Sequence, residues 1–366
     1  MLIRLTVFCV WLPSIASVTV STKNGDLEGF VTSYANFSFA YKHVNKFLGV
    51  PFAAPPTSQL RFKPPKPPLK WKPKVRSAKR HGNVCWQGKA YEVRFKKFVH
   101  NFTYSEDCLF LDIYTPDVKS KLPVMFYIHG GSYEFGATVT FPGDILALHG
   151  VVVVITQYRL GPFGFLTTGD SASPGNFGML DQVAALQWVK ENVENFGGDP
   201  GKVTIFGLSA GGTSVSLHLL SPMSEGLFQQ AIAESGVDLS PFAIQPTSFG
   251  LRFANELAGY LDCPTSDHSE MMACIRQKEA KEIQDASDSI TYIFTGYLRW
   301  APVVDKYFLL DTPRNLRNKG KFEKAKFMIT FNSEEGGTTF RKLVNGSSQS
   351  FFKGYVTQFA HSQTSR

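Results

Sequence analysis

The sequence predicts an α/β protein built on a doubly wound, mostly parallel sheet that follows an N-terminal antiparallel β region. Two almost continuous apolar runs, 123–128 and 151–155, are typical of buried parallel strands. Apolar residues recur at helical spacing over 179–195 and precede a strand at 202–206. A glycine-flanked turn then opens a helix at about 210–220, and this alternation of strands and helices is typical of a doubly wound sheet.

The composition is that of a globular protein with a large core. The chain has 366 residues, of which 43% are hydrophobic and 19% charged, too apolar for disorder. Its longest apolar run after the N-terminus, 145–156, is interrupted by His149 and Gly150 and is shorter than the about 20 residues of a membrane span. These features exclude a multi-span membrane protein.

Residues 1–16 have the features of a signal peptide. Arg4 supplies the positive charge, 5–12 the apolar stretch, and Ser14-Ile15-Ala16 a small-x-small cleavage site. A first core strand is the alternative, but no polar residues alternate along the segment. We therefore expect cleavage after Ala16 and a secreted or extracellular protein.

Short strands at 18–50 and 107–116 form the predicted N-terminal β region, and another strand is expected at 325–330. Three sequons agree with export and mark Asn36, Asn101 and Asn345 as glycosylation candidates.

The cysteines fit an oxidising compartment. Of five, Cys9 would leave with the signal peptide, and an even set remains: Cys85, Cys108, Cys263 and Cys274. Three pairings are possible. We prefer Cys85–Cys108 and Cys263–Cys274, which close short loops, each contributing about 3 kcal/mol in the loop-entropy model. A zinc site is the rival, but no CxxC pair or histidine cluster supports it.

Positive charge is concentrated in one proline-rich stretch. Arg61 to Lys89 contains ten of the 38 basic residues and no acidic one. Its five prolines favour an extended or polyproline II surface segment. The stretch is either a solvated loop or a weak contact for acidic glycans or a membrane surface. No motif supports nucleic-acid binding.

The sharpest chemical signal is the turn Gly207-Leu208-Ser209-Ala210-Gly211, a GxSxG nucleophile elbow between a strand and a helix. The turn is too tight for Cβ atoms on either side, so Gly207 and Gly211 let strand and helix approach while Ser209 projects its hydroxyl. A plain glycine-rich turn is the alternative. Its context favours Ser209 as a catalytic nucleophile.

A second glycine-rich element lies upstream, where a strand ends in His129-Gly130-Gly131. Such backbone can direct N–H groups at a developing oxyanion, and we expect Gly130, Gly131 and Ala210 to form the oxyanion hole. An ordinary turn at the end of a strand is the alternative.

Several segments together resemble the type-B carboxylesterase/cholinesterase family. Its two signatures match 196–211 and 106–116 along their length. Shorter matching patches lie at 158–161, 174–182 and 302–305, and the resemblance covers about residues 22–340. It implies an α/β-hydrolase fold over 17–366, a Ser-Glu-His triad and the local disulfide pairing.

The resemblance places the triad acid at Glu335, in Phe331-Asn332-Ser333-Glu334-Glu335-Gly336, with Glu334 as the alternative. The histidine should follow the acid, yet only His361 does so, in an unsuitable tail. His218 and His268 precede the acid and are expected to have structural or surface roles. We therefore expect a chain whose C-terminal part is missing relative to the family, truncated before the catalytic histidine region.

Two departures from the family shape the expected substrate. Leu208 stands where the family commonly has Glu, and the Cys85–Cys108 loop has Phe98 and Trp86 rather than a tryptophan deep in the loop. Quaternary-ammonium esters are thus disfavoured. The expectation is a secreted serine carboxylesterase acting on small neutral esters by an acyl-enzyme mechanism, without metal or cofactor. Without the histidine region, this form is expected to be very weakly active or inactive. A non-catalytic, neuroligin-like adhesion or ligand-binding protein is the alternative.

Overall fold

A ten-stranded mixed sheet forms the centre of the protein. The computed structural model describes residues 16–34, 38–88, 102–291, 297–333 and 335. The strands lie in the order β1-β2-β3-β7-β9-β8-β10-β11-β12, with β4 beside β2. Their bounds are β1 Ser17–Ser21, β2 Asp26–Ser33, β3 His43–Pro51, β4 Val75–Ser77, β7 Phe110–Thr115, β8 Leu122–Ile128, β9 Val152–Thr156, β10 Gly198–Leu208, β11 Gln230–Glu234 and β12 Lys326–Thr330. A separate short pair joins β5 (Val84–Cys85) to β6 (Tyr104–Ser105).

The strand directions divide the sheet into the two predicted parts. β1, β2, β3 and β7 form antiparallel neighbours, and β7 is also antiparallel to β9. From β9 through β8, β10 and β11 to β12 all neighbours are parallel. The apolar runs at 123–128 and 151–155 are therefore buried parallel strands, as predicted.

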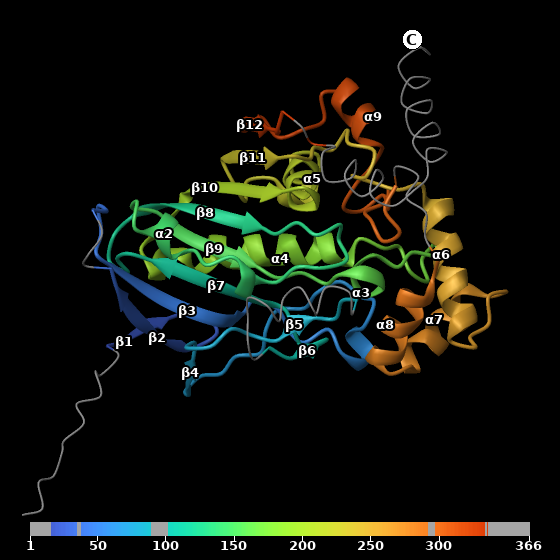
Figure 1. Cartoon of the computed structure of the whole chain (residues 1–366), viewed down its shortest axis with the longest axis horizontal. Coiled ribbons are helices and arrows are strands. Elements are labelled where there is room, and N and C mark those ends of the chain that lie inside the picture. Colours follow the sequence, from blue (N-terminus) through green and yellow to red (C-terminus); the bar gives the residue numbers. More distant parts are fainter. Residues whose placement is uncertain (1–15, 35–37, 89–101, 292–296, 334, 336–366) are drawn as a thin grey trace, which may run out of the picture.

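Helices cover the sheet and extend beyond the ends of its parallel strands, where α6, α7 and α8 gather (Figure 1). The helix bounds are α2 Asp144–Ala147, α3 Gly161–Phe165, α4 Phe177–Asn192, α5 Ala210–His218, α6 Thr247–Tyr260, α7 His268–Gln277, α8 Ala280–Ser289 and α9 Pro313–Asn318. Short 3-10 turns lie at Ser58–Leu60, Thr138–Thr140, Val193–Phe196 and Pro222–Ser224. No helix in the described ranges is long and apolar enough to cross a membrane.

The predicted helix over 179–195 is α4, which starts earlier and ends in a 3-10 turn. Gly197, with φ 78°, terminates that turn. A buried ion pair fixes the helix: the Arg159 guanidinium donates to both carboxylate oxygens of Asp181, at 2.8 and 2.7 Å. This pair ties the loop after β9 to α4.

Both preferred disulfides are present. Cys85 bonds to Cys108 and Cys263 to Cys274, with Cα–Cα distances of 5.0 and 5.7 Å. The first closes the segment that carries β5 and β6, and the second ties α7 to the turn after α6.

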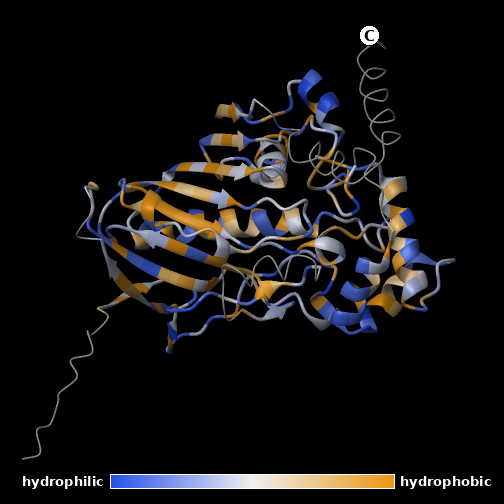
Figure 2. Ribbon diagram, in the orientation of Figure 1, coloured by the Kyte–Doolittle hydropathy of each residue, from blue (hydrophilic) through white to orange (hydrophobic). Residues whose placement is uncertain are grey.

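Strand β12 is the last strand of the described sheet and pairs there with β11 alone. Large apolar side chains stand exposed on or beside it, with Met328, Ile329 and Phe331 at 51%, 52% and 79%. Figure 2 shows this apolar colouring at the top of the sheet, whereas the other strongly apolar strands lie in the interior.

Candidate active site

Ser209 occupies a sharp turn at the carboxyl end of β10. The strand ends at Leu208 and α5 begins at Ala210, which leaves Ser209 alone between them with φ 58° and ψ −119°. A positive φ is strained for a residue with a side chain and is concentrated at functional sites. The Ser209 N–H donates to the Glu234 carbonyl at 2.8 Å, which anchors the turn to the end of β11.

The glycines on both sides of Ser209 are required by close backbone approach. A Cβ on Gly207 would lie 2.6 Å from the Ile128 carbonyl oxygen and 2.7 Å from the Gly211 backbone. A Cβ on Gly211 would lie 2.1 Å from the same Ile128 oxygen. The predicted steric reason for the GxSxG pattern is therefore confirmed, because the end of β8 fills the space that side chains would need.

The glycine pair after β8 lies beside the nucleophile candidate. A Cβ on Gly130 would come within 3.3 Å of the Ser209 Cβ and 2.3 Å of the Leu208 carbonyl oxygen. Gly131 has φ 119°, a conformation that favours glycine. Ala210 begins α5, and the first amides of a helix have no partner within the helix. The three predicted oxyanion residues thus come from two adjoining turns.

His129 fixes the orientation of the Gly130–Gly131 peptide. Its ring stacks on Tyr158 with centroids 4.5 Å apart, and its Nδ1 lies 2.9 Å from the Gly130 carbonyl oxygen. Because a carbonyl only accepts, Nδ1 carries the proton. A trans peptide directs its N–H opposite to its C=O, so the Gly131 N–H points away from the His129 ring. Burial lowers the pKa of His129 to about 4, which keeps the ring neutral.

The rest of the glycine turn is clamped by buried side chains from distant segments. The Gln87 amide donates to the Gly136 carbonyl and accepts from the Gly136 N–H, both at 3.1 Å. The Tyr158 hydroxyl donates to the His129 carbonyl at 2.8 Å, and the Tyr133 hydroxyl bonds to Thr213 in α5. Sequence reasoning missed these residues, since the hydrogen-bond partner of each lies far away in the chain.

The predicted acid lies at the end of another parallel strand. Glu335 follows β12, and its Oε1 accepts from the Ser235 hydroxyl at 2.6 Å and from the Asn332 N–H at 2.7 Å. These hydrogen bonds, the Ser235 bond foremost, hold the pKa of Glu335 below its usual value. A Cβ on Gly236, next to Ser235, would lie 2.4 Å from the Ser209 carbonyl oxygen. Ser235 thus links the loop of the carboxylate to the turn of the serine.

Sequence reasoning missed Ser235 and Asn332, although a serine directly after the parallel strand β11 is a detectable signal. The alternative acid, Glu334, lies outside the described residues, as do Phe98 and the three sequon asparagines.

No described histidine is placed as the base of this site. His218 is fully buried, with Nδ1 2.7 Å from the Ser224 hydroxyl and Nε2 3.0 Å from the Gln182 amide oxygen, a structural role as expected. His268 pairs with Asp170 at 2.6 Å at the start of α7. His361 lies outside the described part of the chain. Within the described residues, Ser209 Oγ has no hydrogen bond to a histidine.

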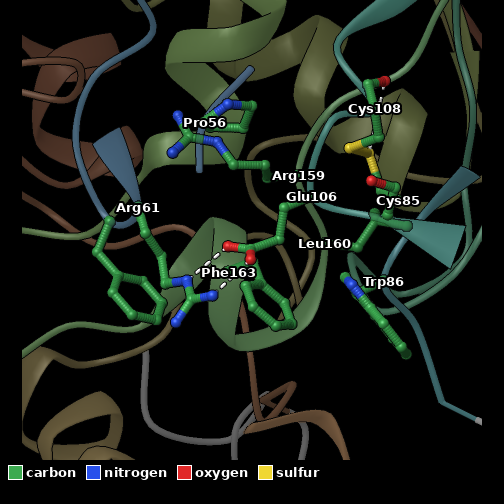
Figure 3. A pocket seen from close by; sticks show the side chains of 11 residues that line it. Pro56, Arg61, Cys85, Trp86, Glu106, Cys108, Arg159, Leu160 and Phe163 are labelled. Atoms are coloured by element: carbon green, nitrogen blue, oxygen red, sulfur yellow. Dashed lines mark hydrogen bonds and ion pairs between the residues drawn. A yellow bond between two sulfur atoms is a disulfide. The ribbon is translucent and has the colours of Figure 1, made fainter. Parts of the chain in front are cut away.

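A small cavity beside the Cys85–Cys108 disulfide is separate from this site (Figure 3). Arg61 and Glu106 face each other in it through two bonds, Nε–Oε1 at 2.6 Å and Nη2–Oε2 at 2.5 Å. Arg61 is 8% exposed, so the expectation that the whole stretch from Arg61 is a basic surface is wrong at this residue. The positive charge of Arg61 instead compensates the carboxylate of Glu106 in the interior. Trp86 also lines this cavity and stacks on Tyr104.

A serine on a strand-to-helix elbow, a glycine turn beside it and a carboxylate after a later parallel strand define the α/β-hydrolase class. Within that class, this chain belongs to the carboxylesterase family, whose family model matches residues 16–364.

Curated relatives agree with the family. Carboxylesterase 5A of Canis lupus familiaris is 42% identical over 87% of this chain and 56% of its own length. Pyrethroid hydrolase Ces2e of Rattus norvegicus is 42% identical over 88% of this chain and 56% of its own length. Cocaine esterase of Homo sapiens is 41% identical over 90% and 58%. The chain thus spans little more than half the length of these relatives.

Proposed function

We propose that this protein is a secreted serine carboxylesterase that hydrolyses small neutral carboxylic esters through an acyl-enzyme. The observation that carries the proposal is the conformation of Ser209, held at positive φ between β10 and α5 and against Gly130. A binding protein has no need of a serine in this strained position. The relatives named carboxylesterase, pyrethroid hydrolase and cocaine esterase support ester substrates.

In the proposed reaction the Ser209 hydroxyl attacks the ester carbonyl while a histidine takes its proton. The backbone N–H groups of Gly130, Gly131 and Ala210 stabilise the oxyanion, where loss of one donor typically costs about 2.7 to 4 kcal/mol. The histidine then protonates the leaving alcohol, and water hydrolyses the acyl-serine by the same route. Glu335 would hold the histidine in its tautomer and stabilise the imidazolium.

The preference for neutral esters rests on Leu208. Its side chain is 43% exposed next to Ser209, and it brings an apolar surface and no charge to the mouth of the site. A cationic substrate would find no carboxylate at this position, whereas a neutral acyl or alkoxy group would gain apolar contact.

The test is hydrolysis of p-nitrophenyl butyrate by the 366-residue chain, beside S209A, H361A and the control S289A at an exposed serine. Only His361 follows Glu335 in this sequence. We therefore expect only a slow rate, because the oxyanion hole and substrate binding by themselves leave roughly 10³- to 10⁴-fold catalysis over water when a triad member is missing. S209A, H361A and S289A should all stay near this slow rate, and a butyryl group should form on Ser209 in every form except S209A.

If the wild-type chain forms no butyryl group on Ser209, or S209A forms one equally well elsewhere, Ser209 is not the nucleophile and the proposed function is refuted. A fast rate that is lost in H361A would keep the esterase but identify His361 as its base. Mass spectrometry for a butyryl group on Ser209 distinguishes an acyl-enzyme from a serine that only positions water.

A further inference from the structure

We propose that residues 63–80, here named the basic strap, form a binding surface for a linear sulfated polysaccharide. The proposal is independent of the esterase reaction, since the strap lies along the antiparallel part of the sheet through the pairing of β4 with β2. All its cationic side chains are exposed: Lys63, Lys66, Lys70, Lys72, Lys74, Arg76, Lys79 and Arg80. It contains no acidic residue.

The first half of the strap has the periodicity of a polyproline II helix. Pro65, Pro68 and Trp71 are partly buried, and the residues between them are exposed. A repeat of three residues is that of polyproline II, which advances about 9 Å per turn. Lysines such as Lys63 and Lys66, one repeat apart, therefore lie in a row along the outer edge of an extended ribbon.

The body of the protein holds this ribbon in place. The Ala54 N–H donates to the Lys66 carbonyl at 2.8 Å, and the Asn24 amide donates to the Pro68 carbonyl at 3.2 Å. The Trp71 indole N–H donates to the Asp26 carbonyl at 2.9 Å. The cations thus project from a backbone that is already ordered, so ligand binding does not include the conformational-entropy cost of ordering it.

Most of this charge is uncompensated. Among the described residues, Lys79 is the strap cation in an ion pair, 2.7 Å from Glu28 of β2. Arg76 lies over the Trp71 ring at 5.9 Å and acts electrostatically on Asp107. The lysines from Lys63 to Lys74 are exposed to solvent, and the strap itself contains no carboxylate that could pair with them. A row of unpaired ammonium groups attracts a polyanion with charges spaced along a line.

The side chains around the lysines favour a polysaccharide over other polyanions. Single-stranded nucleic acid needs exposed aromatic faces for base stacking, and Trp71 is packed inward beneath Arg76. A membrane-bound segment buries a continuous apolar face, but the strap exposes only two large aliphatic side chains, Leu69 at 81% and Val75 at 55%, six residues apart. Sulfate groups on a linear polysaccharide can bind to a row of cations without an aromatic or apolar face beside it.

The test compares two variants that remove the same charge. K63Q/K66Q/K70Q/K72Q neutralises four exposed lysines of the strap, and K119Q/K121Q/K321Q/K324Q neutralises four exposed lysines elsewhere. Both are applied to immobilised heparin and eluted with salt, with thermal melts to confirm folding. We expect the wild type and the control to elute together. The strap variant should lose about tenfold or more in affinity at physiological salt and have a shallower salt dependence. Desulfated heparin should not compete.

Equal losses in the two quadruple variants would overturn the proposal, because binding would then follow net charge alone. A second arm uses vesicles containing phosphatidylserine with the wild type and L69S. If L69S abolishes vesicle binding and the strap variant still binds heparin like the wild type, the strap is a membrane contact and the polysaccharide assignment is wrong.

Discussion

At the scale of single residues, burial decides what role a side chain can take, and the two buried histidines are examples. His129 and His218 are both fully buried, and burial lowers their pKa values to about 4 and about 3. Each is neutral in the folded protein and serves by hydrogen bonding, His129 to the glycine turn and His218 to Gln182 and Ser224. A histidine in a conspicuous motif is therefore not the proton carrier here.

These histidines predict acid sensitivity. Their folded pKa values lie below the unfolded value of about 6.5, so the unfolded chain binds more protons and stability is lost as pH falls below about 6.5. At pH 5 each should cost about 2 kcal/mol of unfolding free energy relative to neutral pH. H218Q should remove about half of this joint loss in urea titrations at pH 7.5 and 5.0. H43Q, at an exposed histidine, should retain the wild-type pH dependence. An unchanged pH dependence in H218Q would contradict a neutral buried ring.

At the scale of elements, the elbow works because three pieces of backbone meet. β10, α5 and the end of β8 approach so closely that glycine is the residue that fits at 207 and 211. The register pairs Gly207 with Ile128, which brings the turn after β8 beside Ser209. The same packing of β10, α5 and the end of β8 therefore sets the positions of both the nucleophile and the glycine turn.

This packing predicts opposite effects for two glycine substitutions. In G211A the new Cβ meets the Ile128 carbonyl at 2.1 Å and the His129 carbonyl carbon at 3.0 Å, backbone atoms that cannot easily move. It should lower the free energy of unfolding by about 1 to 3 kcal/mol. G259A in α6 meets nothing within 4 Å and should raise stability by about 0.5 to 1 kcal/mol through helix propensity. Urea titration measures both, and a neutral G211A would show that α5 can shift from the sheet.

For the whole molecule, Arg61 joins regions far apart in the sequence. Besides its two bonds to Glu106, its Nη1 donates to the Arg276 carbonyl at 3.0 Å and the Lys278 carbonyl at 2.5 Å. The Arg276 guanidinium donates back to the Arg61 carbonyl at 3.2 Å. One guanidinium thus connects the segment entering the basic strap, the Cys85–Cys108 loop and the end of α7.

Removal of Arg61 should destabilise the entire fold. R61M leaves the Glu106 carboxylate largely buried and unpaired, which should cost about 3 to 5 kcal/mol. The double variant R61M/E106L removes the unpaired charge and should recover a large part of that loss. K281M, which breaks the exposed Lys281–Asp285 pair, should change stability by less than about 0.5 kcal/mol. If R61M unfolds with the stability of K281M, the guanidinium does not hold these regions together.

The sequence by itself predicted the parallel core and the elbow, and among three possible cysteine pairings it favoured the one that the structure shows. These features are local in the chain: an apolar run of strand length, five residues that force a tight turn, and cysteines separated by 23 and 11 residues. Local patterns are set by steric and hydrophobic periods that can be read directly in the amino-acid order.

Tertiary structure alone decided the partners of those features. Arg61 sits in the most basic stretch of the chain, yet it is buried against Glu106 and the end of α7. Glu335 is oriented by Ser235, and Gly136 by Gln87, across 100 and 49 residues. Such contacts exist only once the sheet has brought distant strand ends to one edge. The sequence fixes no pairwise distance between those residues, because the path of the chain between them is set by packing of the whole core.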